Sequence, residues 1–165
     1  MTGEAVSDDV FLEISLFKDF DQTQLDLLRQ VFVSCDCHAQ TIVFEQGSPA
    51  EYLYLVVSGE LLIRYKPEDG PDINVARVRD GGVVGWSAII NKRNYTSSVE
   101  CATYTHLLRV SSAELQSLCE KYPETGTIIL DRLVAVIAER LRATSPGMYE
   151  LLESSLRNGV NCPGG

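Results

Sequence analysis

The spacing of apolar and polar residues divides the chain into a helical start, a strand-rich middle and a helical end. Residues 10–33 carry apolar side chains at helical spacing, and Asp21 stands at a suitable N-cap position before Leu25 and Leu28. From about residue 37, β-branched and aromatic residues come in short runs separated by turns. From Ser111 the helical spacing returns. The sequence therefore predicts a helical pair, a β region and further helices, in that order.

The middle of the chain predicts six short strands. Ser58-Gly59-Glu60 leaves room only for a tight hairpin turn between the second strand and the third. Turn-forming residues recur about every 8–12 residues, which is typical of a β-sandwich or barrel. The strands are expected at residues 40–44, 52–57, 61–66, 73–78, 97–101 and 105–110.

Two helices are predicted after the strands. The first begins at Ser111 or Ser112 and is broken at Tyr122-Pro123, and the second runs from Pro123 to about Arg142. The long helix carries two neighbouring apolar stripes, one of Leu130, Val134, Ile137 and Leu141 and one of Ile129, Leu133 and Val136. So broad an apolar arc packs either wholly within its own domain or partly against a second copy, and the pattern leaves both open.

Length and charge limit the possible classes of protein. The 165 residues suffice for one domain with a buried core, which we expect at residues 10–143, between a flexible arm at 1–9 and a short helical or disordered tail at 144–165. The net charge of −9 argues against broad binding to nucleic acid or to an anionic membrane. No apolar run approaches the ~18 residues of a membrane span.

The cysteines and histidines favour a cytoplasmic protein without a metal. The five cysteines are irregularly spaced, and the acidic start is unlike a signal peptide, so we expect a reducing compartment. Two histidines are too few for a histidine-based metal site, and Cys35-Asp36-Cys37-His38 reads better as a strand edge than as a metal-binding fragment. No nucleophile motif is present, so we predict no enzyme, no metal and no cofactor.

The strongest candidate for ligand binding is the segment from Gly81 to Val99. It holds several glycines, the only tryptophan of the chain, and the hydroxyl row Thr96, Ser97 and Ser98. Glycines let the backbone approach a ligand, and N–H groups and hydroxyls can face an anion. Taken alone, the composition of the segment favours an ordinary glycine-rich turn between two strands.

The order of these elements resembles the cyclic-nucleotide-binding domain of catabolite-activator proteins and protein-kinase-A regulatory subunits. The resemblance covers about residues 10–143 and implies a mainly β fold with flanking helices. That fold is a double-stranded β-helix, or jelly-roll barrel, with an N-terminal helical pair and a long C-terminal helix. It is carried by Leu16-Phe17, by TIVFEQG at 41–47, by YLYLVVSGE at 52–60, by Gly81-Gly82 and by Tyr122-Pro123.

The resemblance makes residues 81–99 the phosphate-binding cassette of the family, which has a turn, a short helix and a loop. In the family, a glutamate accepts from the ribose 2′-hydroxyl and an arginine neutralises the cyclic phosphate. This sequence keeps Gly85 and Ala88, but Trp86 stands in place of the glutamate and Tyr95 in place of the arginine. The residues expected to face a ligand are Val84, Gly85, Trp86, Ser87, Ala88, Arg93, Tyr95, Thr96 and Ser97.

The two replacements weaken the expected binding of cAMP or cGMP, because the ribose and the phosphate each lose a charged partner. We therefore expect a stand-alone regulatory or sensor module that does not bind these nucleotides tightly. Trp86 and Tyr95 can line an altered pocket for another nucleotide-like or small anionic ligand. They can instead fill the pocket, which would leave a degenerate, ligand-free protein–protein interaction or scaffold domain.

The expected macromolecular partner is another protein, or a second copy bound along the helix from Tyr122 to Arg142. Transcription factors of the catabolite-activator type continue past this helix into a helix-turn-helix unit. Only 23 residues follow Arg142. We therefore expect no direct DNA binding and no membrane partner.

Overall fold

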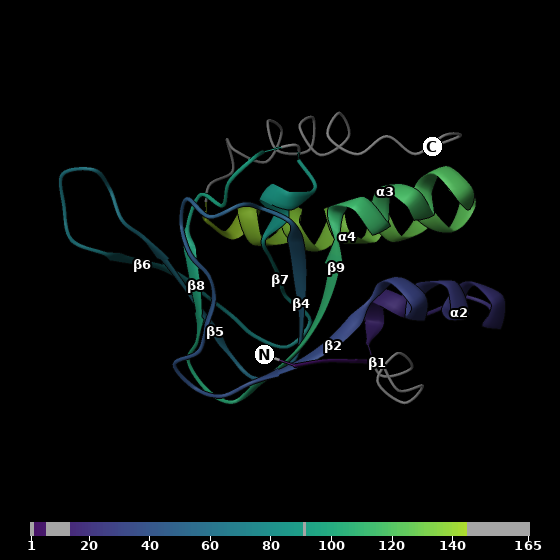
Figure 1. Cartoon of the computed structure of the whole chain (residues 1–165), viewed down its shortest axis with the longest axis horizontal. Coiled ribbons are helices and arrows are strands. Elements are labelled where there is room, and N and C mark those ends of the chain that lie inside the picture. Colours follow the sequence, from purple (N-terminus) through teal and green to yellow (C-terminus); the bar gives the residue numbers. More distant parts are fainter. Residues whose placement is uncertain (1, 6–13, 91, 145–165) are drawn as a thin grey trace.

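The described strands form two separate antiparallel sheets, and three described α-helices flank them (Figure 1). The computed structural model describes residues 2–5, 14–90 and 92–144. The five-stranded sheet has the order β1 (Thr2–Ala5), β2 (Val33–Cys37), β9 (Thr105–Ser111), β4 (Tyr52–Ser58) and β7 (Val83–Val84). The four-stranded sheet has the order β3 (Ile42–Phe44), β8 (Ser98–Cys101), β5 (Leu61–Tyr65) and β6 (Ile73–Val78).

The mainly β class with flanking helices is confirmed, whereas the closed jelly-roll barrel is not. Among the described strands, neither sheet closes on itself: β1 and β7 end one sheet, and β3 and β6 end the other. The hairpin turn predicted at residues 58–60 joins β4 to β5, which lie in different sheets. The turn therefore leads the chain from one sheet to the other, and the hydrogen-bonded partners of β5 are β6 and β8 rather than β4.

Two of the helices begin directly after a residue whose side chain caps them, as the sequence predicted. In α2 (Gln22–Val31), the Asp21 side chain accepts from the Gln24 amide at 2.8 Å, and the Gln24 side chain accepts from the Asp21 amide at 3.1 Å. In α3 (Ser112–Lys121), the Ser111 hydroxyl accepts from the Glu114 amide at 3.0 Å. The caps predicted at Asp21 and Ser111 are therefore confirmed. A 3₁₀ turn, η1 (Ser15–Phe17), precedes α2, and α4 (Pro123–Thr144) follows α3.

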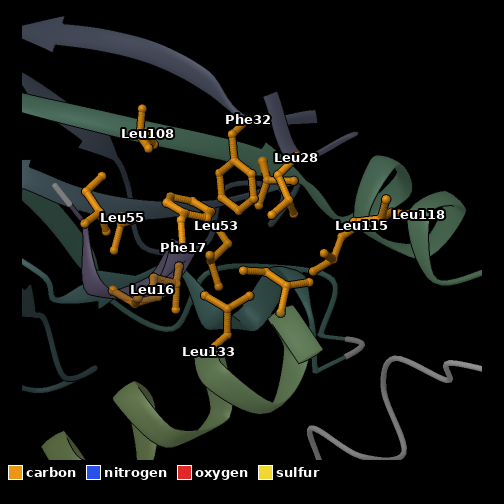
Figure 2. Close-up of a cluster of buried hydrophobic side chains, with 14 of the residues drawn as sticks. Leu16, Phe17, Leu28, Phe32, Leu53, Leu55, Leu108, Leu115, Leu118 and Leu133 are labelled. Atoms are coloured by element: carbon orange, nitrogen blue, oxygen red, sulfur yellow. The ribbon is translucent and has the colours of Figure 1, made fainter. Parts of the chain in front are cut away.

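Strands β4 and β9 lie between two hydrophobic cores, because successive side chains of a strand point to opposite faces. Leu53, Leu55 and Leu108 face the helices, where they meet Phe17 and Phe32 (Figure 2). Tyr54, Val56 and Leu107 belong to a second core with residues of the four-stranded sheet. Two buried faces explain why residues 52–57 read as a continuous apolar run rather than as an alternating one.

The long helix α4 packs its apolar arc mainly on its own domain. Ile129, Leu133 and Ile137 are buried in the helical core, and Leu130 and Val134 are partly buried against the same core. Within the described ranges, no helix combines the length and the hydropathy needed to cross a membrane.

The sequence predicted no strand at β1 or β7, and of β2 it predicted only the end, as a strand edge at residues 35–38. Helix α2 ends at Val31, and β2 follows where the sequence predicted helix up to residue 33. Residues 33–37 are strand because they pair with both β1 and β9, and such tertiary pairing outweighs local spacing. Strand β1 lies within the predicted arm, and β7 has only two residues. Residues 6–13, where the first helix was expected to begin, and the tail at 145–165 lie outside the described residues.

Candidate functional site

The segment of residues 81–99 (the cassette segment) turns sharply at Gly85. Strand β7 pairs with β4 through Val83 and Val84, and the chain then turns into a 3₁₀ helix, η2 (Trp86–Ala88). Gly85 has a φ of +81°, and a Cβ atom at this position would lie 2.8 Å from the Tyr52 carbonyl oxygen. Only glycine suits both the left-handed conformation and this contact. The close backbone approach expected of Gly85 therefore exists, and the group approached is the chain's own Tyr52.

Tyr95 occupies the space between the cassette segment and the strands. Its hydroxyl donates to the Tyr52 carbonyl oxygen at 2.6 Å and accepts from the Tyr52 amide at 3.0 Å. Its ring stacks on Phe44 with centroids 3.8 Å apart and planes inclined by 16°. The residue is only 5% exposed, and burial raises the pKa of its phenol. Tyr95 is thus held both at its ring and at its hydroxyl.

A small cavity of about 30 Å³ remains beside Tyr95. This is room for about one to three water molecules, whereas pockets for drug-sized ligands measure at least about 300 Å³. A nucleotide would enter only after the surrounding side chains had moved. The cavity is lined by Phe44, Gly85, Trp86, Ser87, Tyr95, Thr96, Ser97, Val99 and Arg140.

The structure brings most of the predicted site residues together at this cavity. Six of the nine line it: Gly85, Trp86, Ser87, Tyr95, Thr96 and Ser97. Val84 is instead buried in the core between the sheets, and Ala88 is buried in η2. Arg93 is exposed, and its carbonyl oxygen accepts from the Ala50 amide at 2.9 Å. The basic side chain nearest in sequence to Tyr95 therefore does not line the cavity.

Arg140 of α4 supplies the positive charge at the cavity. Its guanidinium carbon lies 4.0 Å from the centroid of the Trp86 ring, and its Nη1 donates to the Val83 carbonyl oxygen at 3.0 Å. Burial lowers the pKa of Arg140 to about 10, so the side chain is still charged at neutral pH. Arg140, Ser87 and Thr96 all line the cavity, so a cation and two hydroxyl-bearing residues border the same space.

Sequence reasoning missed Phe44, Val99 and Arg140. No local motif connects Arg140 to the cassette segment, because it stands on a helix that only the packing of α4 brings alongside. Trp86 and Tyr95, which the sequence treated as a pair, also differ: Tyr95 is buried in the pocket, whereas Trp86 is partly exposed under Arg140.

A second polar cluster lies on the five-stranded sheet. Ser34 Oγ is 2.8 Å from His106 Nε2, and His106 Nδ1 is 2.8 Å from Asp36 Oδ1. The order serine–histidine–carboxylate is that of hydrolase triads. Ser34 and Asp36, however, lie within β2, which pairs with β1 and β9 on its two sides, so its amides point along the sheet rather than toward the Ser34 side chain. A triad needs amide donors aimed at the reacting oxygen, so we interpret the cluster as a cross-strand contact.

No group of three or more histidine, cysteine, aspartate or glutamate side chains is arranged to hold a metal ion in the part of the chain that the structure describes. Cys35 and Cys37 are buried thiols of β2 that face the core between the sheets, whereas Asp36 faces the opposite side.

Comparison with known proteins supports the resemblance. A family model described as the cyclic nucleotide-binding domain matches residues 36–122. A CRP-like cAMP-activated global transcriptional regulator from Mycobacterium tuberculosis is 23% identical over 145 residues, which cover 88% of this chain and 63% of the relative. A cyclic nucleotide-binding domain from Methylobacillus flagellatus superposes with a TM-score of 0.71 at 22% identity, over 82% of this chain and 76% of that one.

The expectation of no direct DNA binding is wrong. It rested on the short stretch that follows Arg142, but curated relatives from Mycobacterium tuberculosis and Escherichia coli are transcriptional regulators. The chain spans 63% of the length of the M. tuberculosis regulator that it matches. The point at which this sequence ends therefore carries no conclusion about DNA.

The fold also occurs in an enzyme. A cAMP-binding acyltransferase from Mycobacterium smegmatis superposes with a TM-score of 0.67 at 20% identity, over 83% of this chain and 43% of that one. The absence of catalysis in this protein therefore stays a prediction.

Proposed function

This chain belongs to the cyclic nucleotide-binding domain family, and we propose that it is a regulatory module that does not bind cAMP or cGMP tightly. One observation carries the proposal. Tyr95, in the position of the family's phosphate-binding arginine, is buried and hydrogen-bonded to both polar backbone atoms of Tyr52, and the cavity beside it measures about 30 Å³.

The cost of opening this pocket supports weak binding. Displacing Tyr95 breaks two hydrogen bonds, each worth about 0.5–1.5 kcal/mol, and a ring stack worth about 0.5–1.5 kcal/mol. At about 1.4 kcal/mol per tenfold, this weakens a nucleotide's affinity on the order of ten- to a thousandfold. The phosphate would then also lack the family's arginine.

The proposed regulatory role follows that of the relatives, but the proposal does not extend their ligand, cAMP, to this chain. Curated relatives from Mycobacterium tuberculosis and Escherichia coli are described as cAMP-activated global transcriptional regulators, and this chain matches about three fifths of their length. A regulatory subunit from Trypanosoma brucei with the same fold is described as belonging to a cAMP-independent protein kinase A. That description supports a regulatory use of the fold that does not depend on cAMP.

Isothermal titration and thermal shift with cAMP and cGMP test the proposal. A ligand at 100 times its dissociation constant should stabilise the fold by about 2.7 kcal/mol, so we expect no shift with either nucleotide at concentrations up to about 1 mM. A saturable shift with micromolar affinity would overturn the proposal.

A second candidate function is the sensing of a small anion, and the position of Arg140 favours it. The guanidinium shares the cavity with the side chains of Ser87, Thr96 and Ser97. Titration with inorganic phosphate and with sulfate tests this candidate. We expect Arg140→Met to abolish any saturable response while keeping most of the side chain's apolar stem. A response that survives this substitution would place the anion elsewhere.

A further inference from the structure

Two buried thiols from different sheets meet at one end of the molecule. Cys37 is the last residue of β2, in the five-stranded sheet, and Cys101 is the last residue of β8, in the four-stranded sheet. Both are free thiols, their exposures are 2% and 1%, and both belong to the core between the sheets. Strands β2 and β8 are not hydrogen-bonded to each other, so the two side chains approach only across this core.

The backbone around the two thiols holds them close together. The connection from β2 to β3 and the connection from β8 to β9 lie at the same end of the molecule (Figure 1). The Gln40 amide donates to the Cys101 carbonyl oxygen at 2.7 Å, and the Cys101 amide donates to the Thr41 carbonyl oxygen at 2.9 Å. Cys37 is the register partner of Thr105, where β9 begins after the second connection. The two cysteines therefore lie on adjoining segments that backbone contacts join.

A hydrogen bond links the thiols of Cys37 and Cys101. It is the largest cause of a raised pKa for Cys37 and of a lowered pKa for Cys101. Cys101 is therefore the thiol that loses its proton more easily, and a hydrogen bond with the Thr105 side chain also lowers its pKa. Because the thiolate is the reactive form of cysteine, the pair contains one sulfur suited to attack and a second sulfur beside it.

We propose that Cys37 and Cys101 form a reversible disulfide between the two sheets when hydrogen peroxide oxidises this protein. The Cys101 thiolate attacks one oxygen of the peroxide and the O–O bond breaks, which gives a sulfenic acid on Cys101 and a hydroxide that takes up a proton to become water. The Cys37 sulfur then attacks the Cys101 sulfur. The S–O bond breaks, and the leaving oxygen takes the Cys37 proton and departs as a second water. Two thiols and one peroxide thus give one disulfide and two waters.

The position of the pair at the end of the molecule gives a small oxidant a way in. Burial ordinarily makes a thiol inert. Here, however, residues 38–40 directly after Cys37 and residues 103–104 shortly after Cys101 are exposed. A local opening of these two connections, without unfolding of either sheet, is enough to admit a molecule as small as hydrogen peroxide.

The disulfide fixes the strand that leaves the cassette segment. Strand β8 begins at Ser98, and Val99 lines the small cavity beside Tyr95. A bond from Cys101 to Cys37 ties this strand covalently to the five-stranded sheet. A cross-link between residues far apart in the sequence restricts the unfolded chain, so the oxidised protein is the more stable form. The proposal does not depend on which ligand, if any, the cassette segment binds.

Peptide mapping after oxidation tests the proposal. The reduced, folded chain is treated with excess hydrogen peroxide, the remaining thiols are blocked with N-ethylmaleimide, and linked peptides are identified by mass spectrometry. We expect a link between Cys37 and Cys101 that dithiothreitol reverses. We also expect oxidation to raise the melting temperature of the parent by about 5 °C or more.

Cys35→Ala is the matched control. Cys35 lies on the same strand and in the same core at 1% exposure, but burial, rather than a hydrogen bond with Cys101, is the largest cause of its raised pKa. Cys37→Ala and Cys101→Ala should each lose the linked peptide and the rise in melting temperature, whereas Cys35→Ala should keep both. Melting of the reduced variants shows that each one is folded before peroxide is added.

Several results would overturn the proposal. One is a folded parent whose Cys37 and Cys101 stay unlinked in excess peroxide, and another is oxidation of Cys101 that ends at the sulfinic acid. A link from Cys101 to Cys35 would assign the wrong partner. A rise in melting temperature that survives Cys37→Ala would place its cause at other cysteines. The mapping of the parent decides the question even where an alanine variant fails to fold.

Discussion

The Tyr95 hydroxyl replaces a missing strand beside Tyr52. Strand β7 pairs with Tyr54 and Leu55 of β4, and the chain then turns away at Gly85. The amide and carbonyl of Tyr52 would be left without ladder partners on this edge, and the phenol of Tyr95 bonds to both, at 3.0 and 2.6 Å. One side chain therefore continues the ladder and occupies the space between the cassette segment and the strands.

Removing only this hydroxyl should destabilise the fold. Tyr95→Phe keeps the stack on Phe44 but leaves two polar atoms of Tyr52 unpaired in a largely buried place. We expect a loss of about 1–3 kcal/mol in the free energy of unfolding, measured by urea denaturation. Tyr104→Phe is the matched control, since Tyr104 is 56% exposed, and should change stability by less than about 0.5 kcal/mol. Equal stabilities of the two variants would mean that the Tyr95 hydroxyl has no ladder role.

Substitutions at Gly81 and Gly85 should distinguish the cost of backbone strain from the cost of a steric contact. Gly81 and Gly85 have φ values of +84° and +81°, but a Cβ on Gly81 would meet nothing within 4 Å, whereas one on Gly85 would lie 2.8 Å from the Tyr52 oxygen. We expect Gly81→Ala to cost about 1–2 kcal/mol from the left-handed conformation alone. Gly85→Ala should cost more, by about 1–3 kcal/mol, because the backbone must also shift. Chemical denaturation of both variants measures the difference, and equal costs would mean that the contact with Tyr52 is easily relieved.

Alkaline pH should weaken the fold through Tyr95. Burial raises the pKa of Tyr95 above the ordinary value of about 10, so the unfolded chain loses this proton first as the pH rises. The contribution of Tyr95 is therefore fully present below pH ~10 and is lost as the pH rises through the higher folded value. Arg140 acts in the opposite sense, because its folded pKa of about 10 lies below the unfolded one. The test is the difference between the parent and Tyr95→Phe, whose stability should fall less steeply above pH ~10. Parallel pH profiles would contradict it.

The sequence predicted the helices and six of the strands because each has its own local pattern. Asp21 caps α2 and Ser111 caps α3, as predicted, and residues 52–57 are apolar enough to identify a central strand. The start of strand β2 was predicted as helix because the strand depends on long-range pairing with β9, which local spacing does not encode. Strand β7 was missed because two residues are too few for any pattern.

The candidate site was predictable only where it is continuous in sequence. The local pattern of residues 81–99 identified the cassette segment, and six of the nine predicted site residues line the cavity. Arg140 depends on the packing of α4, and the bond from Tyr95 to Tyr52 depends on where β7 stops, so neither could be read from the chain. Arg93, the basic residue expected at the site, is exposed instead. The conformation of its loop determines whether the side chain faces the cavity or solvent, and local sequence does not predict that conformation.

The cluster of Ser34, His106 and Asp36 should matter for stability rather than catalysis. His106→Ala removes the partner of the largely buried Ser34 hydroxyl, and we expect a loss of about 1–3 kcal/mol in the free energy of unfolding. Asp36→Ala removes only the more exposed contact and should cost at most about 1 kcal/mol. Thermal and urea denaturation of both variants provide the measurement. Covalent labelling of Ser34 by a fluorophosphonate probe would contradict the structural role.

Restoring the family's two charged residues should create cyclic-nucleotide binding. In Trp86→Glu with Tyr95→Arg, the pocket loses the ring that stacks on Phe44 and regains an acceptor for the ribose and a cation for the phosphate. We expect cAMP or cGMP to bind at least about tenfold more tightly than to the parent, as measured by isothermal titration. Each single substitution should give less, because Trp86→Glu leaves Tyr95 in the pocket and Tyr95→Arg leaves the ribose without its carboxylate. A folded double variant, verified by circular dichroism, that binds neither nucleotide better than the parent would show that Arg140 and α4, rather than Tyr95, exclude the nucleotide.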